Sequence, residues 1–506
     1  MGPGGEQARK AGAGSDQWPT ATTRREFVKG IGGALGGALL LGGSGGRSAF
    51  GRGMPGAPLL PTGYIFYRVY TLGDDVFPFA PLTAITPGVM FSDSAQIIFH
   101  GNNAAGERGV YALAMDFTGP VPRVTGGNKI VEHGDILADG RLVDRIAVGD
   151  TNAAGSYATV ISTANPGNVL GPPPNPTPTA PPITAPGLYI RTPSNGGLVS
   201  LAQFTDPTPG LAGGEFSALF GDVALQDDDT THLVASYALP RLSATQGPAI
   251  QQGLFSFAQG KASTGGTLVV STGELLPQSS AIIRSLGLID VARDGNYVAQ
   301  AHAQELRHVL SRRGDTASGP LQASVLLNGN VHQPVSQARL LAAEGELAQT
   351  ASVVEGETVI GPRVGPGNVV AHVVHTPSGG HQLMRFAGQQ SSRLRQTGEL
   401  GGNAVPVRAI GGPVVSSTGL TFHVQFTEDA VNELWVTNGI DHRLLLSSLD
   451  GLRPSGAITE ILHGYHPRQV DSAGRMAFTG EFLINPGGDR FDPANIGTAI
   501  IVGIPY

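Results

Sequence analysis

Short apolar runs alternate with clusters of Gly, Asn, Asp and Pro along most of the chain. The runs are rich in β-branched and aromatic residues, a pattern that predicts β-strands bounded by turns. Many are apolar at every position, as expected where sheets stack face to face. The most regular runs are 109–113, 187–190, 253–257, 323–327, 382–386, 433–436 and 498–502. The hydrophobic pattern therefore predicts an all-β protein.

The runs recur in a repeated unit with two fixed points. A Gly followed by an acid, as at Gly134-Asp135, lies about 21 residues before a turn Gly, as at Gly155, which opens another apolar run. Successive copies start 52 to 72 residues apart. The seven copies begin at Gly73-Asp74, Gly134-Asp135, Thr205-Asp206, Gly273-Glu274, Gly345-Glu346, Gly398-Glu399 and Asp450-Gly451, with turn positions at Ala95, Gly155, Thr230, Gly295, Gly367, Gly419 and Gly474. Constant spacing inside the unit predicts one repeat array with loops of unequal length.

Four apolar runs per copy and seven copies predict a seven-bladed β-propeller of four-stranded antiparallel blades. The seventh copy stops after its third run, 498–502, and an extra run, 64–70, precedes the first copy. We therefore predict that the N-terminal strand 64–70 pairs with the last blade and closes the ring. An open or split β array is the alternative, although such an array needs capping repeats and none is visible.

Composition supports this architecture and excludes some classes of binding partner. Gly accounts for 74 of 506 residues and Pro for 37, while 40% of the residues are hydrophobic, which suits many short strands joined by tight turns. We expect a single domain over 60–506 with a Pro-rich insertion at 165–186. The net charge of −7 argues against nucleic acid and anionic membranes as partners. With no Cys, neither a disulfide nor a thiol nucleophile is available.

The N-terminal segment resembles a bacterial twin-arginine export signal. Arg24 and Arg25 are followed by Phe27, Lys29 and a short Gly/Ala/Leu stretch that is too short and too Gly-rich to span a membrane comfortably. This resemblance implies that residues 1–50 are an export signal and disordered leader. It also implies interaction with the twin-arginine export machinery, a periplasmic or extracellular location and no stable membrane anchor.

The repeat itself resembles a group of uncharacterised bacterial exported tandem-repeat proteins of the Asn-x-x-Gly-x-x-x-Phe type, which are propeller-like. The best copy is the octapeptide from Asp471 to Phe478, Asp-Ser-Ala-Gly-Arg-Met-Ala-Phe, and the best connector is Gly-Asp-Ile-Leu at 134–137. The resemblance covers roughly residues 60–506. Several copies depart from it: Thr159 and Ala371 occupy the Phe position. The resemblance implies the fold and no particular activity.

The acids of the repeat are the first candidate ligands. In a propeller with this strand order, they would gather on the face that carries the connectors between blades. A ring of carboxylates could bind a cation, or each acid could cap its own turn by accepting backbone N–H groups. Their occurrence in every copy favours capping. The seven acids are Asp74, Asp135, Asp206, Glu274, Glu346, Glu399 and Asp450.

Histidines are the second candidates. His100 and His372 occupy the same position of the second strand in two copies, and His423 lies one place earlier in a third. A metal held between blades and single buried histidines are both compatible with this pattern. We predict no catalytic residue, because the chain has no nucleophile elbow and no phosphate-binding loop. No cofactor is the default expectation, and a divalent metal is the alternative.

The prediction of function comes from the unequal lengths of the predicted loops. The predicted loops between second and third strands are unequal, with long ones at 165–186, 240–252, 307–322 and 485–497. Loops on a rigid scaffold are where binding usually develops. We interpret the protein as a binding or interaction module that uses its loop-rich face for an unknown protein or small-molecule ligand. The alternative is a metal-dependent hydrolase or oxidoreductase with acids and histidines at the channel mouth, and the sequence does not decide whether the protein is an enzyme.

Overall fold

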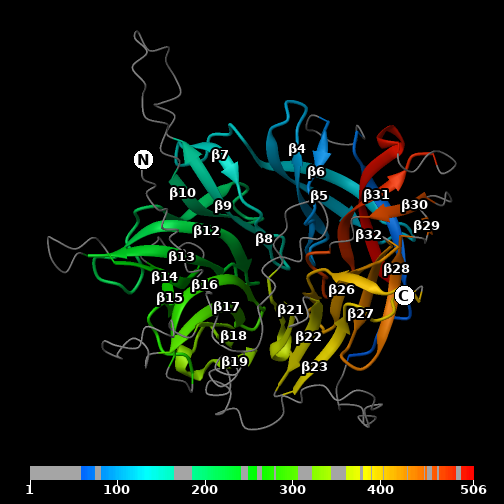
Figure 1. The fold of residues 1–506 in the computed structure, drawn as a ribbon. Coiled ribbons are helices and arrows are strands. Elements are labelled where there is room, and N and C mark those ends of the chain that lie inside the picture. The colour runs from blue at the N-terminus through cyan, green and yellow to red at the C-terminus, as the bar shows by residue number, and fades with distance from the viewer. Residues whose placement is uncertain are drawn as a thin grey trace, which may run out of the picture.

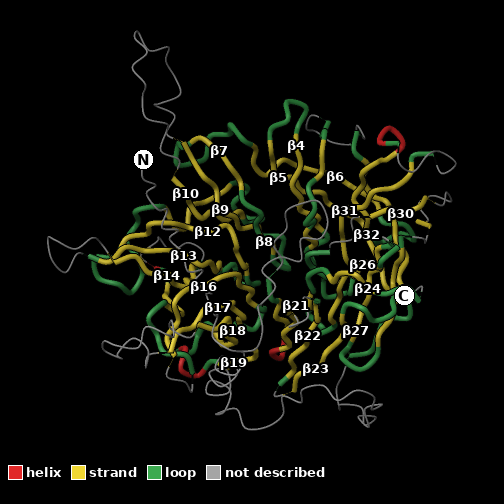
Figure 2. Tube along the Cα trace, in the orientation of Figure 1, coloured by secondary structure: helices red, strands yellow, loops and turns green. Residues whose placement is uncertain are grey.

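The protein is built from β-strands in all the parts that the structure describes. The computed structural model describes residues 58–73, 81–164, 185–240, 249–258, 265–277, 281–305, 322–342, 361–375, 380–388, 390–402, 404–429, 431–448, 451–452, 459–463, 467–485 and 492–506. Among these residues there is no α-helix, and the 3-10 turns that lie wholly within them are η3 (Val335–Gln337), η4 (Pro366–Asn368) and η5 (Pro493–Asn495). Figure 2 shows the strands filling the molecule. Within the same ranges no helix is long and apolar enough to cross a membrane.

The strands form seven antiparallel sheets placed around a central axis, and the colour in Figure 1 runs once round the ring from blue to red. Blade 1 contains β2 (Ala84–Ile85), β3 (Met90–Phe91), β4 (Gln96–Asn102), β5 (Arg108–Asp116) and β6 (Arg123–Glu132). Blade 2 contains β7 (Leu142–Ile146), β8 (Asp150–Thr151), β9 (Tyr157–Ala164), β10 (Ala185–Arg191) and β11 (Leu198–Gln203). Blade 3 contains β12 (Glu215–Leu225), β13 (Thr231–Leu239), β14 (Ala249–Phe257) and β15 (Thr267–Ser271).

The remaining four blades repeat this order. Blade 4 contains β16 (Ala281–Val291), β17 (Asn296–Glu305), β18 (Gln322–Asn330) and β19 (Arg339–Ala342). Blade 5 contains β20 (Arg363–Gly365), β21 (Val369–His375), β22 (His381–Ala387) and β23 (Gln390–Gln396). Blade 6 contains β24 (Val407–Ile410), β25 (Val414–Val415), β26 (Thr421–Thr427), β27 (Asn432–Thr437) and β28 (His442–Ser447). Blade 7 contains β29 (Gly451–Leu452), β30 (Thr459–His463), β31 (Met476–Leu483), β32 (Ile496–Pro505) and β1 (Tyr64–Thr71). The predicted seven-bladed β-propeller is confirmed.

The ring closes as predicted, by the N-terminal strand joining the last blade. β1 pairs antiparallel with β32, from Tyr64 opposite Pro505 to Thr71 opposite Ala499. The amide of Thr62 donates to the carbonyl of Tyr506 over 3.0 Å, which extends the pairing beyond the strand. The ring of Phe66, on β1, lies 5.9 Å from that of Phe478 on β31. One sheet therefore joins the beginning and the end of the described chain.

The turns between first and second strands have the predicted left-handed residue. Gly155, Gly295 and Gly474 have φ values of 85°, 81° and 79°, and Ala95 takes the same conformation with a φ of 60°. In blade 3 the predicted position, Thr230, is wrong by one residue, because the positive φ of 65° belongs to Asp229.

The hydrogen bond that closes the blade 3 turn explains the shift. The amide of Gln226 donates to the carbonyl of Thr230, as the amide of Asn152 does to that of Ser156 in blade 2. The residue before the acceptor takes the left-handed conformation, and Asp tolerates that conformation better than the β-branched Thr.

Apolar side chains fill the spaces between neighbouring blades. One buried cluster joins blades 3 and 4, another joins blades 6 and 7, and a third joins blade 7 to blade 1. In the third cluster the rings of Tyr70 and Tyr111 lie 6.2 and 5.8 Å from that of Phe99. Because burial of such rings supplies much of the hydrophobic stabilisation, each blade depends on both of its neighbours. This packing holds the inner strands in fixed positions around the axis.

Candidate functional site at the two ends of the channel

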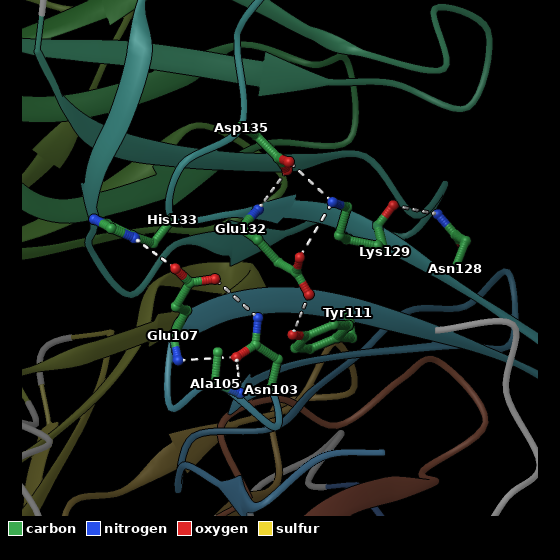
Figure 3. A network of polar contacts seen from close by, with 9 residues as sticks. All are labelled: Asn103, Ala105, Glu107, Tyr111, Asn128, Lys129, Glu132, His133 and Asp135. Atoms are coloured by element: carbon green, nitrogen blue, oxygen red, sulfur yellow. Dashed lines mark hydrogen bonds and ion pairs between the residues drawn. The ribbon is translucent and has the colours of Figure 1, made fainter. Parts of the chain in front are cut away.

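The acids of the repeat cap their own turns wherever the structure describes them. Oδ2 of Asp135 accepts a hydrogen bond from the amide of Glu132 over 2.7 Å, as Figure 3 shows. The same bond, to the amide three residues earlier, is made by Asp206 at 2.8 Å, Glu274 at 3.0 Å and Glu399 at 3.1 Å. Asp74, Glu346 and Asp450 lie outside the described residues. Capping is therefore the role seen for four of the seven acids, and a cation shared by the ring stays a prediction.

The candidate histidines lie in separate blades. His100 is in β4, His372 in β21 and His423 in β26, each exposed by 2% or less. Burial lowers the pKa of all three to about 3, so each ring is neutral at pH 7. Within the described ranges, no three side chains of His, Asp or Glu are close enough to share a metal ion. The structure does not gather these histidines because second strands stand one layer out from the axis, where their side chains meet the neighbouring blade.

A large groove lies on the face that carries the connectors and the loops between second and third strands, and we call it the loop-end groove. Its volume is about 640 Å³. It runs along blades 1 to 3, and its walls contain apolar residues of three strands, among them Ile146, Val160 and Leu219. Its ionisable lining residues are Glu107, Arg108, His133, Asp144 and Arg145. Much of the four long loops predicted for this face lies outside the described residues.

The charges of the loop-end groove form exposed pairs. Nδ1 of His133 lies 3.5 Å from Oε1 of Glu107, and both side chains are nearly half exposed. Nε of Arg145 lies 3.7 Å from Oδ2 of Asp144, and the Arg145 side chain is 87% exposed. Nε of Arg108 is buried and has no hydrogen-bond partner within the described ranges. The two exposed pairs therefore offer donors and acceptors that a ligand can reach.

A hydrogen-bond network fixes the rim of the groove (Figure 3). Oδ1 of Asn103 accepts the amides of Ala105 and Glu107, each over 2.9 Å, which folds the loop back on itself. Nδ2 of the Asn103 side chain also donates to Oε2 of Glu107 over 3.2 Å. This bond leaves Oε1 directed at His133. Preorganised polar groups of this kind lower the entropic cost of binding.

Lys129 holds the two acids of the capped turn that precede and follow His133. Its Nζ lies 2.9 Å from Oδ1 of Asp135 and 3.2 Å from Oε2 of Glu132. The hydrogen bond to Asp135 raises the pKa of Lys129, and the bond to Glu132 raises it further. Oη of Tyr111 donates to the other oxygen of Glu132 over 2.7 Å. Asp135 thus both caps its turn and pairs with Lys129, two residues after His133 (Figure 3).

A second, smaller cavity lies at the opposite end of the inner strands, and we call it the turn-end cavity. Its volume is about 110 Å³, and residues from all seven blades line it just before or within the turns between first and second strands. Along β12, for example, Leu219 lines the groove and Leu225 lines the cavity. The charged residues of this lining include Asp150, Asp290, Arg363 and Arg468. The two hollows therefore lie toward opposite ends of the inner strands, which we call the two ends of the channel.

Aspartates of three successive blades tie the inner strands together near the turn-end cavity. Oδ2 of Asp150 in blade 2 accepts the amide of Leu225 in blade 3 over 2.9 Å. Asp222 in blade 3 accepts the amide of Ile289 in blade 4 over 2.9 Å. The same link from Asp290 in blade 4 to the amide of Val364 in blade 5 measures 2.7 Å. Each carboxylate therefore replaces a backbone hydrogen bond that adjacent blades cannot form.

The cationic and amide groups of the turn-end cavity complete this network. Nη1 of Arg363 lies 3.3 Å from Oδ1 of Asp290, with only 17% of the arginine side chain exposed. Nε2 of Gln469, in blade 7, donates to Oδ1 of Asp150 over 2.6 Å and so links blade 7 to blade 2 across the cavity. Burial raises the pKa of Asp150 to about 6 although the charge of Arg468 opposes the shift. Burial also lowers the pKa of Arg468, and the nearby charge of Arg363 lowers it further.

Arg293 bridges the surface of the turn end. Its Nη1 lies 3.1 Å from Oδ2 of Asp93 in blade 1, and its Nε lies 3.1 Å from Oδ2 of Asp227 in blade 3. Oδ1 of Asp93 accepts the amide of Ser472 in blade 7 over 2.7 Å. These contacts join the turns of four blades. Burial raises the pKa of the Asp93 carboxyl, but the hydrogen bonds from Arg293 and Ser472 and the charge of Arg293 together outweigh it, so the pKa is lowered overall.

Sequence reasoning did not identify the turn-end cavity as a site. Asp150 and Asp290 each lie five residues before a turn Gly, and Arg363 lies four before Gly367. A charged residue inside an otherwise apolar first-strand run, as at Asp290, was the available signal. Its meaning depends on knowing that the inner strand faces an axis shared with six others. Only the closed ring brings these residues together.

Comparisons with known proteins identify no family. No family model matches the chain, and no curated protein matches its sequence. An oligogalacturonate lyase from Vibrio parahaemolyticus matches in structure with a TM-score of 0.38 and 12% identity, covering 88% of this chain and 92% of that one. Pseudomonas fluorescens PhoX in complex with vanadate matches with a TM-score of 0.36 and 9% identity, covering 88% and 96%.

A third similar structure belongs to a longer protein. A puromycin-hydrolysing peptidase from Mycobacterium tuberculosis matches with a TM-score of 0.29 and 11% identity, covering 85% of this chain and 62% of that one. The chain thus spans less than two thirds of the length of that peptidase. At these identities and TM-scores, none of the three says anything about the ligand or reaction of this protein.

Proposed function

We propose that the protein is an exported binding module that holds a small polar ligand in the loop-end groove. The observation that carries this proposal is the groove itself, a hollow of about 640 Å³ in which polar groups converge over an apolar wall. That volume falls within the range of about 300–1,000 Å³ that is usual for small-molecule sites. The export part of the proposal rests on the Arg24-Arg25 leader, which lies outside the described residues.

The lining indicates the chemistry of the ligand. Glu107 and Asp144 supply two negative charges, and Arg108 and Arg145 supply two positive ones. Because the two signs balance, a net-neutral ligand fits better than a strong anion or cation. The exposed guanidinium of Arg145 can donate to a ligand, and the exposed oxygens of Glu107 can accept from one. A zwitterion or a small polyhydroxylated molecule, with one apolar face against Ile146 and Val160, meets these requirements.

Ligand-detected NMR tests this proposal. The full chain, purified after export, is mixed with a panel of monosaccharides, polyols, free amino acids and betaines. We expect at least one class to bind, and the double variant Glu107→Ala/Arg145→Ala to weaken that binding at least tenfold, since each lost charge-assisted hydrogen bond is worth about 1.5–3 kcal/mol. Arg393→Ala is the matched control, because Arg393 is an exposed arginine of blade 5 that pairs with Glu399 at 3.2 Å.

Two outcomes would contradict the proposal. One is the absence of binding across the whole panel. The other is binding that the double variant and Arg393→Ala affect equally, which would place the ligand elsewhere. Export is measured separately, by fractionating cells that carry the wild-type leader or Arg24→Lys/Arg25→Lys. Retention of the variant in the cytoplasm is expected, and equal export of both forms would refute the twin-arginine route.

A further inference from the structure

Two arginines and one serine in the lining of the turn-end cavity have buried donor atoms without hydrogen-bond partners among the described residues. Nε of Arg363, Nε of Arg468 and the hydroxyl of Ser417 are buried in its lining and have no partner within the described ranges. The carboxylates of the same lining are satisfied, because both oxygens of Asp150 and both oxygens of Asp290 accept a hydrogen bond or an ion pair. Buried donors without acceptors are costly. An acceptor placed between the two arginines would therefore be stabilising.

One of the two arginines of the cavity has no direct ion pair with a described residue, although carboxylates lie near it. Arg363 pairs with Asp290, but Arg468 has no carboxylate within 4.0 Å in the part of the chain that the structure describes. An arginine stays protonated even when buried, and a buried charge needs a counter-charge nearby. Asp150 and Asp222 lie close enough to act on Arg468 electrostatically, yet each is held by the amide of the next blade. A mobile anion could contact both guanidinium groups directly.

The size of the cavity limits what it can hold. A volume of about 110 Å³ accommodates several waters or one small anion, since a water needs at least about 10–15 Å³ measured in this way. It is well below the volume of sites for drug-sized ligands. Guanidinium groups bind planar and tetrahedral oxyanions through paired N–H groups. We propose that the turn-end cavity binds one small oxyanion, a carboxylate, sulfate or phosphate, between Arg363 and Arg468, with the hydroxyl of Ser417 as a third donor.

Isothermal titration calorimetry of the full chain with sodium acetate, sodium sulfate and inorganic phosphate tests this site. We expect saturable one-to-one binding of at least one of the three anions. Arg468→Gln removes the unpaired guanidinium while keeping a long polar side chain, and we expect it to weaken binding at least tenfold. Arg393→Gln is the control for a general loss of positive charge, and it should bind as the wild type does.

A second variant keeps the test decisive if Arg468→Gln fails to fold. Ser417→Ala removes one buried hydroxyl with little change in volume, so it should fold and bind about fivefold more weakly, as the loss of one hydrogen bond predicts. No saturable binding of any of the three anions to the wild type would show that waters fill the cavity and would overturn the proposal. Equal binding by the wild type and a folded Ser417→Ala and Arg468→Gln pair would overturn it as well. Neither result depends on the loop-end groove.

Discussion

The two ends of the channel use charge in opposite ways. At the loop end, the His133–Glu107 and Arg145–Asp144 pairs are exposed and lie on the surface of the propeller. At the turn end, Asp150, Asp222 and Asp290 connect the inner strands of successive blades and are part of the scaffold. The same residue types are therefore replaceable at one end and structural at the other. The contrast teaches that charge in a propeller channel must be interpreted with its burial and its hydrogen-bond partners.

The largest expected effect comes from opening the ring on which both ends depend. Deleting residues 60–70 removes most of β1 and with it the buried rings of Phe66 and Tyr70. Each buried aromatic contributes about 3–5 kcal/mol on the scale of Phe→Ala changes, so we expect the deletion to abolish cooperative unfolding near the wild-type melting temperature. Thermal melting by circular dichroism measures the effect.

The control for that deletion is removal of residues 1–50, the predicted leader. We expect this shorter chain to melt at the wild-type temperature. Coincident melting curves for the two deletions would mean that the β1–β32 pairing contributes little to stability, and the comparison of two ends of one closed channel would then lose its basis.

The fold was predictable from the sequence because its signals are local and repeated. The positive-φ position in the turns, seen at Gly155 and Gly295, could be inferred from spacing alone, and so could the unpaired run at 64–70. The turn-end cavity could not, since Asp150 and Gln469 are hydrogen-bonded across 319 positions of sequence. The histidines could not be placed from the sequence for the same reason. His100 and His372 occupy the same position in their strands, but that position says nothing about the distance between their blades.

A pair of alanine substitutions tests the contrast between the two ends directly. Asp290→Ala leaves the buried Arg363 without its partner and the amide of Val364 without an acceptor. We expect a loss of about 3–5 kcal/mol in the free energy of unfolding, which is usual for breaking a buried ion pair on one side. Asp144→Ala, at the loop end, breaks an exposed pair and should cost less than about 1 kcal/mol.

Urea unfolding measured by tryptophan fluorescence compares these two variants with the wild type. Equal losses for both would show that burial does not separate the two ends of the channel. A loss for Asp144→Ala that exceeds the loss for Asp290→Ala would reverse the comparison and make the loop-end pair the structural one.

The pH dependence of the free energy of unfolding tests the burial of Asp150 at the turn end. The charged and titratable groups that act on its carboxyl are Arg468, Arg363 and Asp290, and burial is the dominant influence, raising its pKa to about 6. In the unfolded chain an aspartate has a pKa of about 3.9. Because the folded protein then binds this proton more tightly, Asp150 makes the free energy of unfolding fall as the pH rises from about 4 to about 6, by up to about 3 kcal/mol.

Buried histidines such as His372, whose pKa is lowered to about 3, change the free energy of unfolding in the opposite direction over part of the same pH range. The substitution Asp150→Asn therefore isolates the contribution of Asp150. The asparagine keeps an oxygen for the amide of Leu225 but cannot ionise. We expect the stability of the variant relative to the wild type to rise between pH 4 and pH 6 and to level off above. A difference that stays constant across this range would mean that Asp150 remains ionised in the folded protein, and that solvent reaches the turn end as freely as it reaches the loop end.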